Sequence, residues 1–426
     1  MSRYLIHNVK VFDSISPESY PGWVLVTDQR IEAVGNQATA MPRPEDAQLV
    51  DGNGGTLMPG LIEPHGHISF PNGKSADFTA FPVEEAMLET VRNAKTALDC
   101  GYTSVFSAAS LKPRLDVVLK REIEAGRVPG PRYKACSPEL TVTGGLGDTN
   151  KMHLPWIANT TFSWVVDGAD EVRRAARMFA REGVDNLKVH LSGDLGPSSA
   201  ASSEQTPMSQ AELEALVEVA RVSELNLVCH ARSAASVKSA LKYGIGIINH
   251  ANYADEEALD GLEQAKDWAM VIPAIGITHA LAYSDGKWDF PRHRMPLFQR
   301  ELEITIATVQ EMRKRGIRVL PGGDYGFVYT PHGDYARDLE LFVDILGFSP
   351  AETLIAATRM GSHVMGMPDE IGIIRAGAYA DLLLVDGDPL RDIRIMQDRE
   401  ALRMIMKDGR PHKLTAGTPV REGVAA

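Results

Sequence analysis

Hydrophobic and polar residues follow two different patterns along this chain of 426 residues. Near both ends, short apolar runs are bounded by glycine, proline or aspartate and often alternate with polar residues, which is typical of β-strands. These runs cover residues 4–12, 23–27, 30–35 and 48–51 near the start, and 371–374, 380–385 and 402–406 near the end. The pattern predicts a small discontinuous β-sandwich domain formed by residues 1–57 and 371–426.

Between these ends, apolar strand-like runs alternate with segments in which apolar residues recur every three or four positions, as on one face of a helix. The predicted strands cover residues 57–67, 102–108, 132–143, 186–192, 226–230, 245–250, 270–276 and 317–323. The predicted helices cover residues 84–99, 116–125, 170–182, 210–223, 256–266 and 299–315, and Ser349-Pro-Ala-Glu352 opens a further helix with a capping box. Eight strands with intervening helices predict an α/β fold, a (β/α)8 TIM barrel over residues 58–370. A doubly wound open sheet is the alternative, but no G-x-G-x-x-G follows the first strand.

The composition narrows the choice of partners. A net charge of −12 argues against nucleic acid or an anionic membrane as a partner. No apolar run approaches the roughly 18 residues that span a bilayer, and the first ten residues lack the apolar segment of a secretory signal. The three cysteines (Cys100, Cys136 and Cys229) form neither a disulfide framework nor a zinc knuckle. We therefore expect a cytoplasmic protein with a small-molecule substrate, and we expect a homo-oligomer.

Residues with metal-binding chemistry fall at the ends of the predicted strands. His65 and His67 are separated by one residue, so they point to the same side of a strand and can share a metal ion. This H-x-H motif alone fits a metal site and a pair of satisfied polar residues about equally well. In a TIM barrel, however, catalytic residues gather at the carboxyl ends of the strands. The ends of the later strands supply Lys188, His230, His250 and Asp324.

Five sequence motifs resemble those of a known superfamily. They are P-G-L-I-E-P-H-G-H at residues 59–67, N-L-K-V-H-L-S-G at 186–193, V-C-H-A at 228–231, I-I-N-H-A at 247–251 and G-G-D-Y-G at 322–326. Together they resemble the amidohydrolase superfamily with a binuclear metal centre. Within it, the chain is similar to the imidazolonepropionase-like, prolidase-like branch, which includes ochratoxin-type amidases and aryl-urea hydrolases. The resemblance covers nearly the whole chain.

The resemblance implies a role for each of these residues. Lys188 would be carboxylated by CO2 and would bridge two divalent metal ions, for which zinc suits imidazole and carboxylate ligands. The ions would activate a bridging hydroxide, and Asp324 would act as general base and then as general acid. The implied ligands are His65, His67 and Asp324 for the first ion and His230 and His250 for the second, with Lys188 shared.

The implied reaction is hydrolysis of the amide bond of an N-acyl hydrophobic or aromatic amino acid or of a dipeptide, with ochratoxin-type amides included. The predicted substrate contacts are His190, Arg232, Leu146 and Trp288. Leu146 stands where the branch commonly has a histidine, in T-G-G-L-G-D. For His190 a satisfied histidine inside the barrel, and for Arg232 a surface ion pair, are the competing interpretations. Long rim segments also carry the aromatic residues Trp156, Trp164 and Phe290.

Other functions remain possible on the same fold. A hydrolase of cyclic amides, lactones, aryl ureas or carbamates would use the same activated hydroxide. A one-metal deaminase fits less well, because deaminases of this superfamily lack the bridging lysine, whereas this chain has Lys188. A non-catalytic scaffold is disfavoured because all six ligand positions are occupied.

Overall fold

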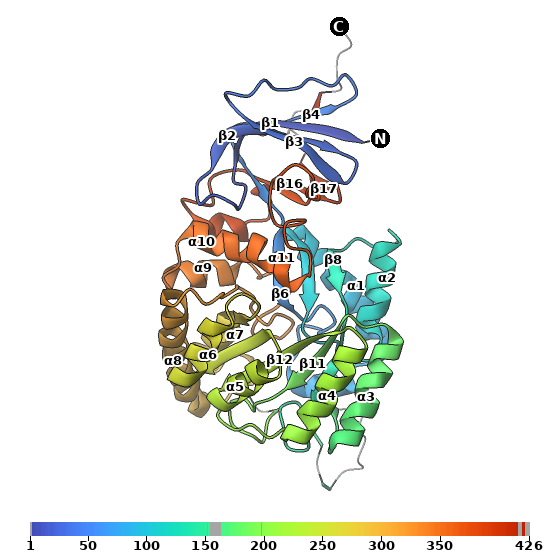
Figure 1. Ribbon diagram of the computed structural model, residues 1–426, viewed down its shortest axis with the longest axis vertical. Coiled ribbons are helices and arrows are strands. Elements are labelled where there is room, and N and C mark those ends of the chain that lie inside the picture. Colours follow the sequence, from blue (N-terminus) through green and yellow to red (C-terminus); the bar gives the residue numbers. More distant parts are fainter. Residues whose placement is uncertain (1, 151, 154–162, 197, 416–419, 422–426) are drawn as a thin grey trace. The chain divides into compact units, whose positions relative to one another are not determined.

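The computed structural model describes residues 2–150, 152–153, 163–196, 198–415 and 420–421 (Figure 1). The chain forms two compact units. The terminal unit contains Met1–Glu63, Lys95–Val105 and Tyr335–Ala426, and the central unit contains Pro64–Ala94 and Phe106–Asp334. The domain boundaries that we placed after residues 57 and 370 stay a prediction.

Strands from both ends of the chain join one nine-stranded sheet in the terminal unit. The main path has the order β17-β16-β15-β5-β1-β2-β3, while β4 pairs with β1 and β18 pairs with β4. Antiparallel pairing of β15 with β5 joins the strands from the two ends of the chain. The strands are β1 (Arg3–Val11), β2 (Tyr20–Thr27), β3 (Arg30–Asn36), β4 (Gln48–Asp51), β5 (Thr56–Pro59), β15 (Leu382–Val385), β16 (Leu402–Lys407), β17 (Arg410–Leu414) and β18 (Val420–Arg421). Their further arrangement as a sandwich stays a prediction.

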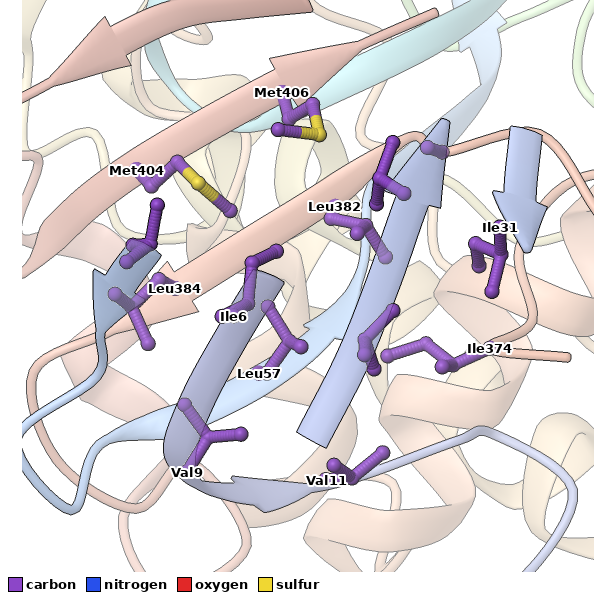
Figure 2. Packing of buried hydrophobic residues seen from close by; sticks show 14 of the residues in the cluster. Ile6, Val9, Val11, Ile31, Leu57, Ile374, Leu382, Leu384, Met404 and Met406 are labelled. Carbon is purple, nitrogen blue, oxygen red and sulfur yellow. The ribbon is translucent and has the colours of Figure 1, made fainter. Parts of the chain in front are cut away.

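A buried apolar cluster holds this sheet together (Figure 2). Leu384 lies opposite Leu57 on one neighbouring strand and opposite Met404 on the other, and all three side chains are fully buried. The strand predicted at residues 371–374 was wrong. Ile374 is buried in the same cluster but belongs to no strand, because Gly372 has a φ of 72° that interrupts an extended backbone.

Helices complete the terminal unit. The predicted capping box is confirmed: the Ser349 hydroxyl accepts from the Glu352 N–H, and the Ser349 N–H donates to the Glu352 carboxylate. The helical segments of this unit are α9 (Arg337–Asp344), α10 (Pro350–Ile355), the π-helix η4 (Ala356–Met360), α11 (Gly361–Val364) and the 3-10 helix η5 (Ile393–Gln397).

The central unit contains a six-stranded parallel sheet with the order β10-β9-β11-β12-β13-β14. These strands are β10 (Trp164–Val165), β9 (Cys136–Thr141), β11 (Asn186–His190), β12 (Asn226–Ser233), β13 (Ile247–Tyr253) and β14 (Met270–Ile272). A second sheet has the order β6-β7-β8, with β6 at Leu61–Gly66, β7 at Tyr102–Ser107 and β8 at Arg132–Lys134. Parallel pairing brings the carboxyl ends of the strands to one edge, where His190 lies opposite His230.

Helices follow most of these strands, which confirms an α/β fold. In Figure 1, α3 and α4 lie side by side in the same unit as the neighbouring strands β11 and β12. The helices are α1 (Val83–Asp99), α2 (Leu115–Glu124), α3 (Ala169–Glu182), α4 (Gln210–Val222), α5 (Ala234–Lys242), α6 (Glu256–Gln264), α7 (Ile275–Ala282) and α8 (Met295–Lys314), with 3-10 helices η1 (Ser75–Ala80), η2 (Lys287–Asp289) and η3 (Arg292–Arg294). Within the described ranges, no helix has the combined length and apolar character that a membrane crossing requires.

Four predicted strands of the barrel region differ from the structure. The strands predicted at residues 57–67 and 132–143 are each divided into two strands that belong to different sheets. The segment 317–323 forms no regular strand. It makes a single bridge to β14 through Val319, where the Leu320 N–H donates to the Val271 carbonyl, and Pro321 beyond it has no N–H to donate. The strand expected at residues 270–276 is only three residues long, because Ala274 adopts a left-handed backbone (φ 50°) that turns the chain into α7. Helices α5, α7 and α9 were not predicted.

The apolar cluster of the terminal unit generates a stability prediction. We expect Leu384→Ala to lower the free energy of unfolding by about 2–5 kcal/mol, because it leaves a cavity between two paired strands. Urea denaturation measures the change. Ile15→Ala is the control, since Ile15 is 47% exposed and should change stability by less than about 0.5 kcal/mol. Equal effects of the two substitutions would contradict the assignment of this core.

Candidate metal centre

The predicted ligands line one pocket of the central unit. His65 lies on β6 and His67 follows the end of that strand, while Lys188 lies on β11, His230 on β12 and His250 on β13. All five lie against the same hollow together with Asp324, and each is nearly inaccessible to solvent. The structure therefore brings the six predicted positions together, although the segment that carries Asp324 is not a regular strand.

Asp324 forms a cluster with His65 and His67. Its Oδ1 lies 3.1 Å from Nε2 of His67 and 3.7 Å from Nε2 of His65. One nitrogen or oxygen atom from each of these residues lies within 4.8 Å of the others. Ligands about 2.0–2.2 Å from a zinc ion are spaced by roughly 3.3 Å from each other when the geometry is tetrahedral. The donor types and their spacing fit a divalent metal ion with imidazole and carboxylate ligands.

A second pair of imidazoles adjoins this cluster. The ring centroids of His230 and His250 are 4.4 Å apart, and those of His250 and His65 are 5.4 Å apart. Nε2 of His230 lies 3.1 Å from the carbonyl oxygen of Gly193. Because a carbonyl only accepts, Nε2 carries the proton and Nδ1 keeps a lone pair. A metal ligand held in one tautomer by a backbone carbonyl is a common arrangement, so His230 fits that role.

Electrostatics keep these side chains in forms that bind cations. Burial lowers the pKa of His65, His230 and His250 well below the usual value, so all three are neutral near pH 7. Burial alone would raise the pKa of the Asp324 carboxyl, but the neighbouring His65 and His67 outweigh it and the pKa is lowered. The site thus presents neutral imidazoles and an ionised carboxylate, the forms that coordinate metal.

Lys188 is the unusual member of the pocket. It is 1% exposed, and burial lowers its pKa although Glu139 and Asp324 act in the opposite direction. Lys188 lies opposite Glu139 in the parallel pairing of β11 with β9. A lowered pKa increases the fraction of neutral amine, which is the form that adds CO2.

Two ligand positions have a strained backbone. His250 has a φ of 83° and Asp324 a φ of 56°, in the left-handed region that residues other than glycine rarely adopt. The pairing of β12 with β13 also shifts register between Ala231 and Ser233, beside His250. Bulges and left-handed residues redirect side chains at the end of a strand, and they concentrate at functional sites.

His190 lines the pocket but is held at both ring nitrogens. Its Nδ1 lies 2.9 Å from the carbonyl oxygen of Leu146, and its Nε2 lies 3.2 Å from Oε1 of Glu139. Oε2 of Glu139 accepts from the Ser163 hydroxyl at 3.0 Å. Burial would raise the pKa of Glu139, but His190 outweighs it and lowers this pKa. The predicted substrate contact of His190 stays a prediction, and the geometry indicates that it fixes Leu146 in the pocket wall.

Arg232 takes part in a buried ion-pair network. Its Nε donates to Oδ2 of Asp194 at 2.7 Å, and its Nη1 donates to Asn252 at 3.0 Å and to Glu301 at 3.2 Å. Arg232 is 3% exposed, so this is a buried network and not the surface ion pair that we weighed. Burial raises the pKa of Glu301 to about 7, against the lowering effect of Arg232. A substrate contact through Arg232 stays a prediction.

An apolar cavity of about 260 Å³ borders the metal pocket. Trp288 lies in its wall, and the ring centroids of Trp288 and Tyr329 are 6.1 Å apart. Five residues line both hollows, so the two are contiguous: Ser75, Asp194, Gly196, Ile277 and Tyr329. Other apolar residues of the cavity are Leu281, Phe290, Phe298 and Val328. Trp164 is placed elsewhere, packing edge-on against Phe179, and Trp156 lies outside the described residues.

Several residues of the site were not predicted from the sequence. Glu139, Asp194 and Glu301 are acids without a motif around them, and they were missed. A signal existed for Glu139, which interrupts an apolar run with an acid, as Lys188 does in its own strand. No comparable signal marks Glu301, because an acidic residue on a long helix is normally exposed.

Imidazoles and a buried lysine on parallel strands, together with the carboxylate of Asp324, form a candidate metal site on an α/β fold. The match to a family model identifies it further: residues 56–411 match the amidohydrolase family, and the chain belongs to this family. It is a hydrolytic enzyme acting on amide bonds, with a TIM-barrel-like α/β fold.

Individual relatives place the chain in the predicted branch. The ochratoxinase of Aspergillus niger is 25% identical over 413 residues, which cover 92% of this chain and 82% of that protein. The imidazolonepropionase of Symbiobacterium thermophilum is 24% identical over 384 residues, which cover 86% and 84%. A solved prolidase, complexed with N-methylphosphonate-L-proline, has a TM-score of 0.87 and 25% identity, covering 97% of this chain and 100% of that chain. The predicted resemblance is confirmed.

The geometry of the pocket generates a prediction on metal content. Protein prepared without chelator should bind divalent metal, and His67→Ala should lose about one ion per chain together with the metal-dependent rise in Tm. Elemental analysis and thermal unfolding with and without added Zn²⁺ measure both effects. His293→Ala is the matched control, because His293 is exposed and lies outside the pocket. Unchanged metal content in His67→Ala would show that the ligand set is wrong.

Proposed function

We propose that the enzyme hydrolyses the amide bond of an N-acyl hydrophobic or aromatic amino acid, or of a dipeptide, with ochratoxin-type amides among its substrates. The observation that carries this proposal is the contiguity of the ligand pocket with an apolar cavity of about 260 Å³. A smaller apolar cavity, of roughly 150 Å³, is already large enough to bind benzene. A scissile amide at the ligand pocket would therefore leave an aromatic side chain within reach of the apolar cavity.

We propose two divalent metal ions, zinc for preference, at the ligand pocket. Lys188, carboxylated at Nζ, would be the shared ligand. Bound there, the ions supply Lewis acidity for the scissile carbonyl and lower the pKa of water. The proposed ligands are His65, His67 and Asp324 for the first ion and His230 and His250 for the second.

The proton transfers fall to Asp324. Its lowered pKa means that the carboxylate carries no proton before the reaction. We propose that it accepts a proton from the attacking water. The same carboxyl then delivers that proton to the nitrogen of the leaving amine. His65 and His67, the other proposed ligands of the first ion, lie 3.7 and 3.1 Å from this carboxylate. Leu146, fixed by His190, would present an apolar wall to the substrate.

The remaining structural expectations stand as proposals. We propose that the central strands close into a (β/α)8 barrel, with residues 317–323 in the place of the eighth strand, and that the terminal unit is a β-sandwich. We also propose that the protein is a cytoplasmic homo-oligomer and that its substrates are small molecules. The net charge of −12 supports the absence of nucleic-acid and membrane partners.

A cyclic amide, lactone, aryl urea or carbamate is the second candidate substrate. The observation in its favour is that Arg232 is already bonded to Asp194, Asn252 and Glu301. A pocket whose buried cation is satisfied by protein acids suits an uncharged substrate as well as a carboxylate. A one-metal deaminase remains less favoured, because Lys188 lines the pocket.

The role of Lys188 generates a prediction. Lys188→Ala should lower kcat by more than about 100-fold, since loss of residues that only orient metal ligands already costs 10–100-fold. Circular dichroism should show an intact fold, and added acetate or propionate should restore part of the activity by replacing the carbamate. Lys266→Ala is the control, because Lys266 is exposed. Normal turnover and full metal content in Lys188→Ala would remove the bridging role.

The apolar cavity generates a prediction on substrates. Trp288→Ala should lower kcat/KM for N-acetyl-phenylalanine by about 10- to 100-fold, because burial of an aromatic side chain contributes on the order of 1.5–3 kcal/mol. The rate for N-acetyl-glycine should change little, since glycine has no side chain to fill the cavity. Trp268→Ala is the control, because Trp268 is 45% exposed and outside both hollows. Rapid opening of cyclic amides or lactones, without cleavage of any N-acyl amino acid, would favour the second candidate.

A further inference from the structure

Tyr329 lies at the border between the ligand pocket and the apolar cavity, because it lines both hollows. Its ring packs against Phe327 and Trp288, whereas its hydroxyl has no hydrogen-bond partner among the described residues. Burial raises the pKa of this phenol, and the carboxylates of Asp324 and Asp194 raise it further, so the hydroxyl carries its proton near pH 7. A protonated and unpaired hydroxyl at this border can donate a hydrogen bond to a ligand.

The other side-chain donors of the ligand pocket are engaged within the protein. His190 is held at both ring nitrogens, by a backbone carbonyl and by a carboxylate. The hydroxyls of Ser75 and Ser198 bond to each other at 2.7 Å, which uses one of their two protons. The remaining polar side chains of the described lining are the proposed metal ligands and two acids. Outside the ligand set, Tyr329 is therefore the side chain whose donor is left for the substrate.

A compact turn holds Tyr329 in a fixed place. The Gly326 N–H donates to the Thr330 carbonyl at 2.9 Å, and the Thr330 N–H donates to the Phe327 carbonyl at 3.1 Å. The Thr330 hydroxyl donates to the Asp324 carbonyl at 2.9 Å, which ties the turn to the backbone of the proposed proton carrier. The ring of Tyr329 stacks on Phe327, with centroids 5.3 Å apart and planes inclined by 11°. A donor fixed before the substrate binds needs little reorganisation during the reaction.

The position of Tyr329 suits the oxygen of the bond that is cleaved. The proposed function puts the scissile amide at the ligand pocket and the substrate side chain in the apolar cavity, so Tyr329 borders the amide. Hydrolysis turns the neutral carbonyl oxygen into an oxyanion, which a fixed donor stabilises more than it stabilises the ground state. A free carboxylate fits this place less well, because its permanent charge would lie near Asp194 and Asp324 as soon as the substrate binds.

We infer that Tyr329 is a catalytic residue, whose phenol O–H donates a hydrogen bond to the oxygen of the scissile carbonyl and stabilises the negative charge that develops there. The inference rests on the proposed function for the identity of the reaction. The phenol keeps its proton throughout, so its role differs from that of Asp324, which transfers one. Loss of the hydroxyl should therefore slow the chemical step and leave the affinity for the substrate nearly unchanged.

The first experiment measures binding and does not depend on turnover. N-methylphosphonyl-phenylalanine carries a tetrahedral, negatively charged phosphonyl group in place of the scissile carbonyl, whereas phenylalanine lacks this group. Isothermal titration of both compounds into metal-loaded protein compares wild type with Tyr329→Phe, which keeps the aromatic ring. The Kd of the phosphonyl compound should rise about 10- to 100-fold, the range for loss of a hydrogen bond to a charged group, while the Kd of phenylalanine changes less than about threefold.

Tyr283→Phe is the matched control, because Tyr283 is 60% exposed and lines neither hollow. The same Kd of the phosphonyl compound in wild type and Tyr329→Phe overturns the inference. So does equal weakening of the phosphonyl compound and phenylalanine, which would indicate a damaged cavity and not a lost hydrogen bond.

The second experiment distinguishes the carbonyl from the carboxylate as the group that Tyr329 contacts. N-acetyl-phenylalanine and its carboxamide share the scissile carbonyl, but only the acid has a free carboxylate. In Tyr329→Phe both compounds should lose about 100-fold in kcat, with KM changed by less than about threefold. A loss confined to the acid and expressed in KM would place Tyr329 at the carboxylate and refute the inference. Cleavage of no amide by the wild-type enzyme would refute the proposed function and leave the titration of the phosphonyl compound to decide on Tyr329.

Discussion

Compensation of buried charge is the constraint on which the site depends. Asp324 is almost buried, yet its carboxylate stays ionised because His65 and His67 surround it. Lys188 is buried in the same pocket, and the acids nearest to it are Glu139 and Asp324. An ionised carboxylate without polar partners would be prohibitively unstable at this depth, so Asp324 requires the neighbouring side chains to be in place. The strands of the central unit must therefore hold their carboxyl ends in register before the pocket can form.

The pairing of buried charges also separates the ligand pocket from the apolar cavity beside it. Asp194 lines both hollows, and its carboxylate is bound by Arg232, which in turn contacts Glu301 on α8. Arg232 finds its partners within the protein, and the apolar residues of the cavity lie beside this network. The polar ligand pocket and the apolar cavity thus adjoin each other although their linings differ in polarity. Enzymes that cleave one bond in substrates with large apolar groups need both environments in contact.

The interior of the terminal unit depends on a different interaction. Its strands come from the two ends of the chain, and the pairing of β15 with β5 joins them. The buried cluster around Leu57, Leu384 and Met404 lies along this junction. Apolar burial is not directional, which explains why Ile374 contributes to the cluster without belonging to a strand. The sequence pattern indicated that the residue is buried, but it did not determine its backbone conformation.

The sequence by itself determined the α/β class, most helix positions and the six residues that meet in the ligand pocket, because hydrophobic periodicity and short motifs are local properties of the chain. It also determined family membership, which the family match confirmed. The tertiary structure alone decided which acids lie near Lys188, why Arg232 is occupied and how His250 is turned by a left-handed backbone. These facts depend on contacts between residues far apart in the sequence. Charge pairing in the interior is set by three-dimensional proximity, and no local pattern encodes it.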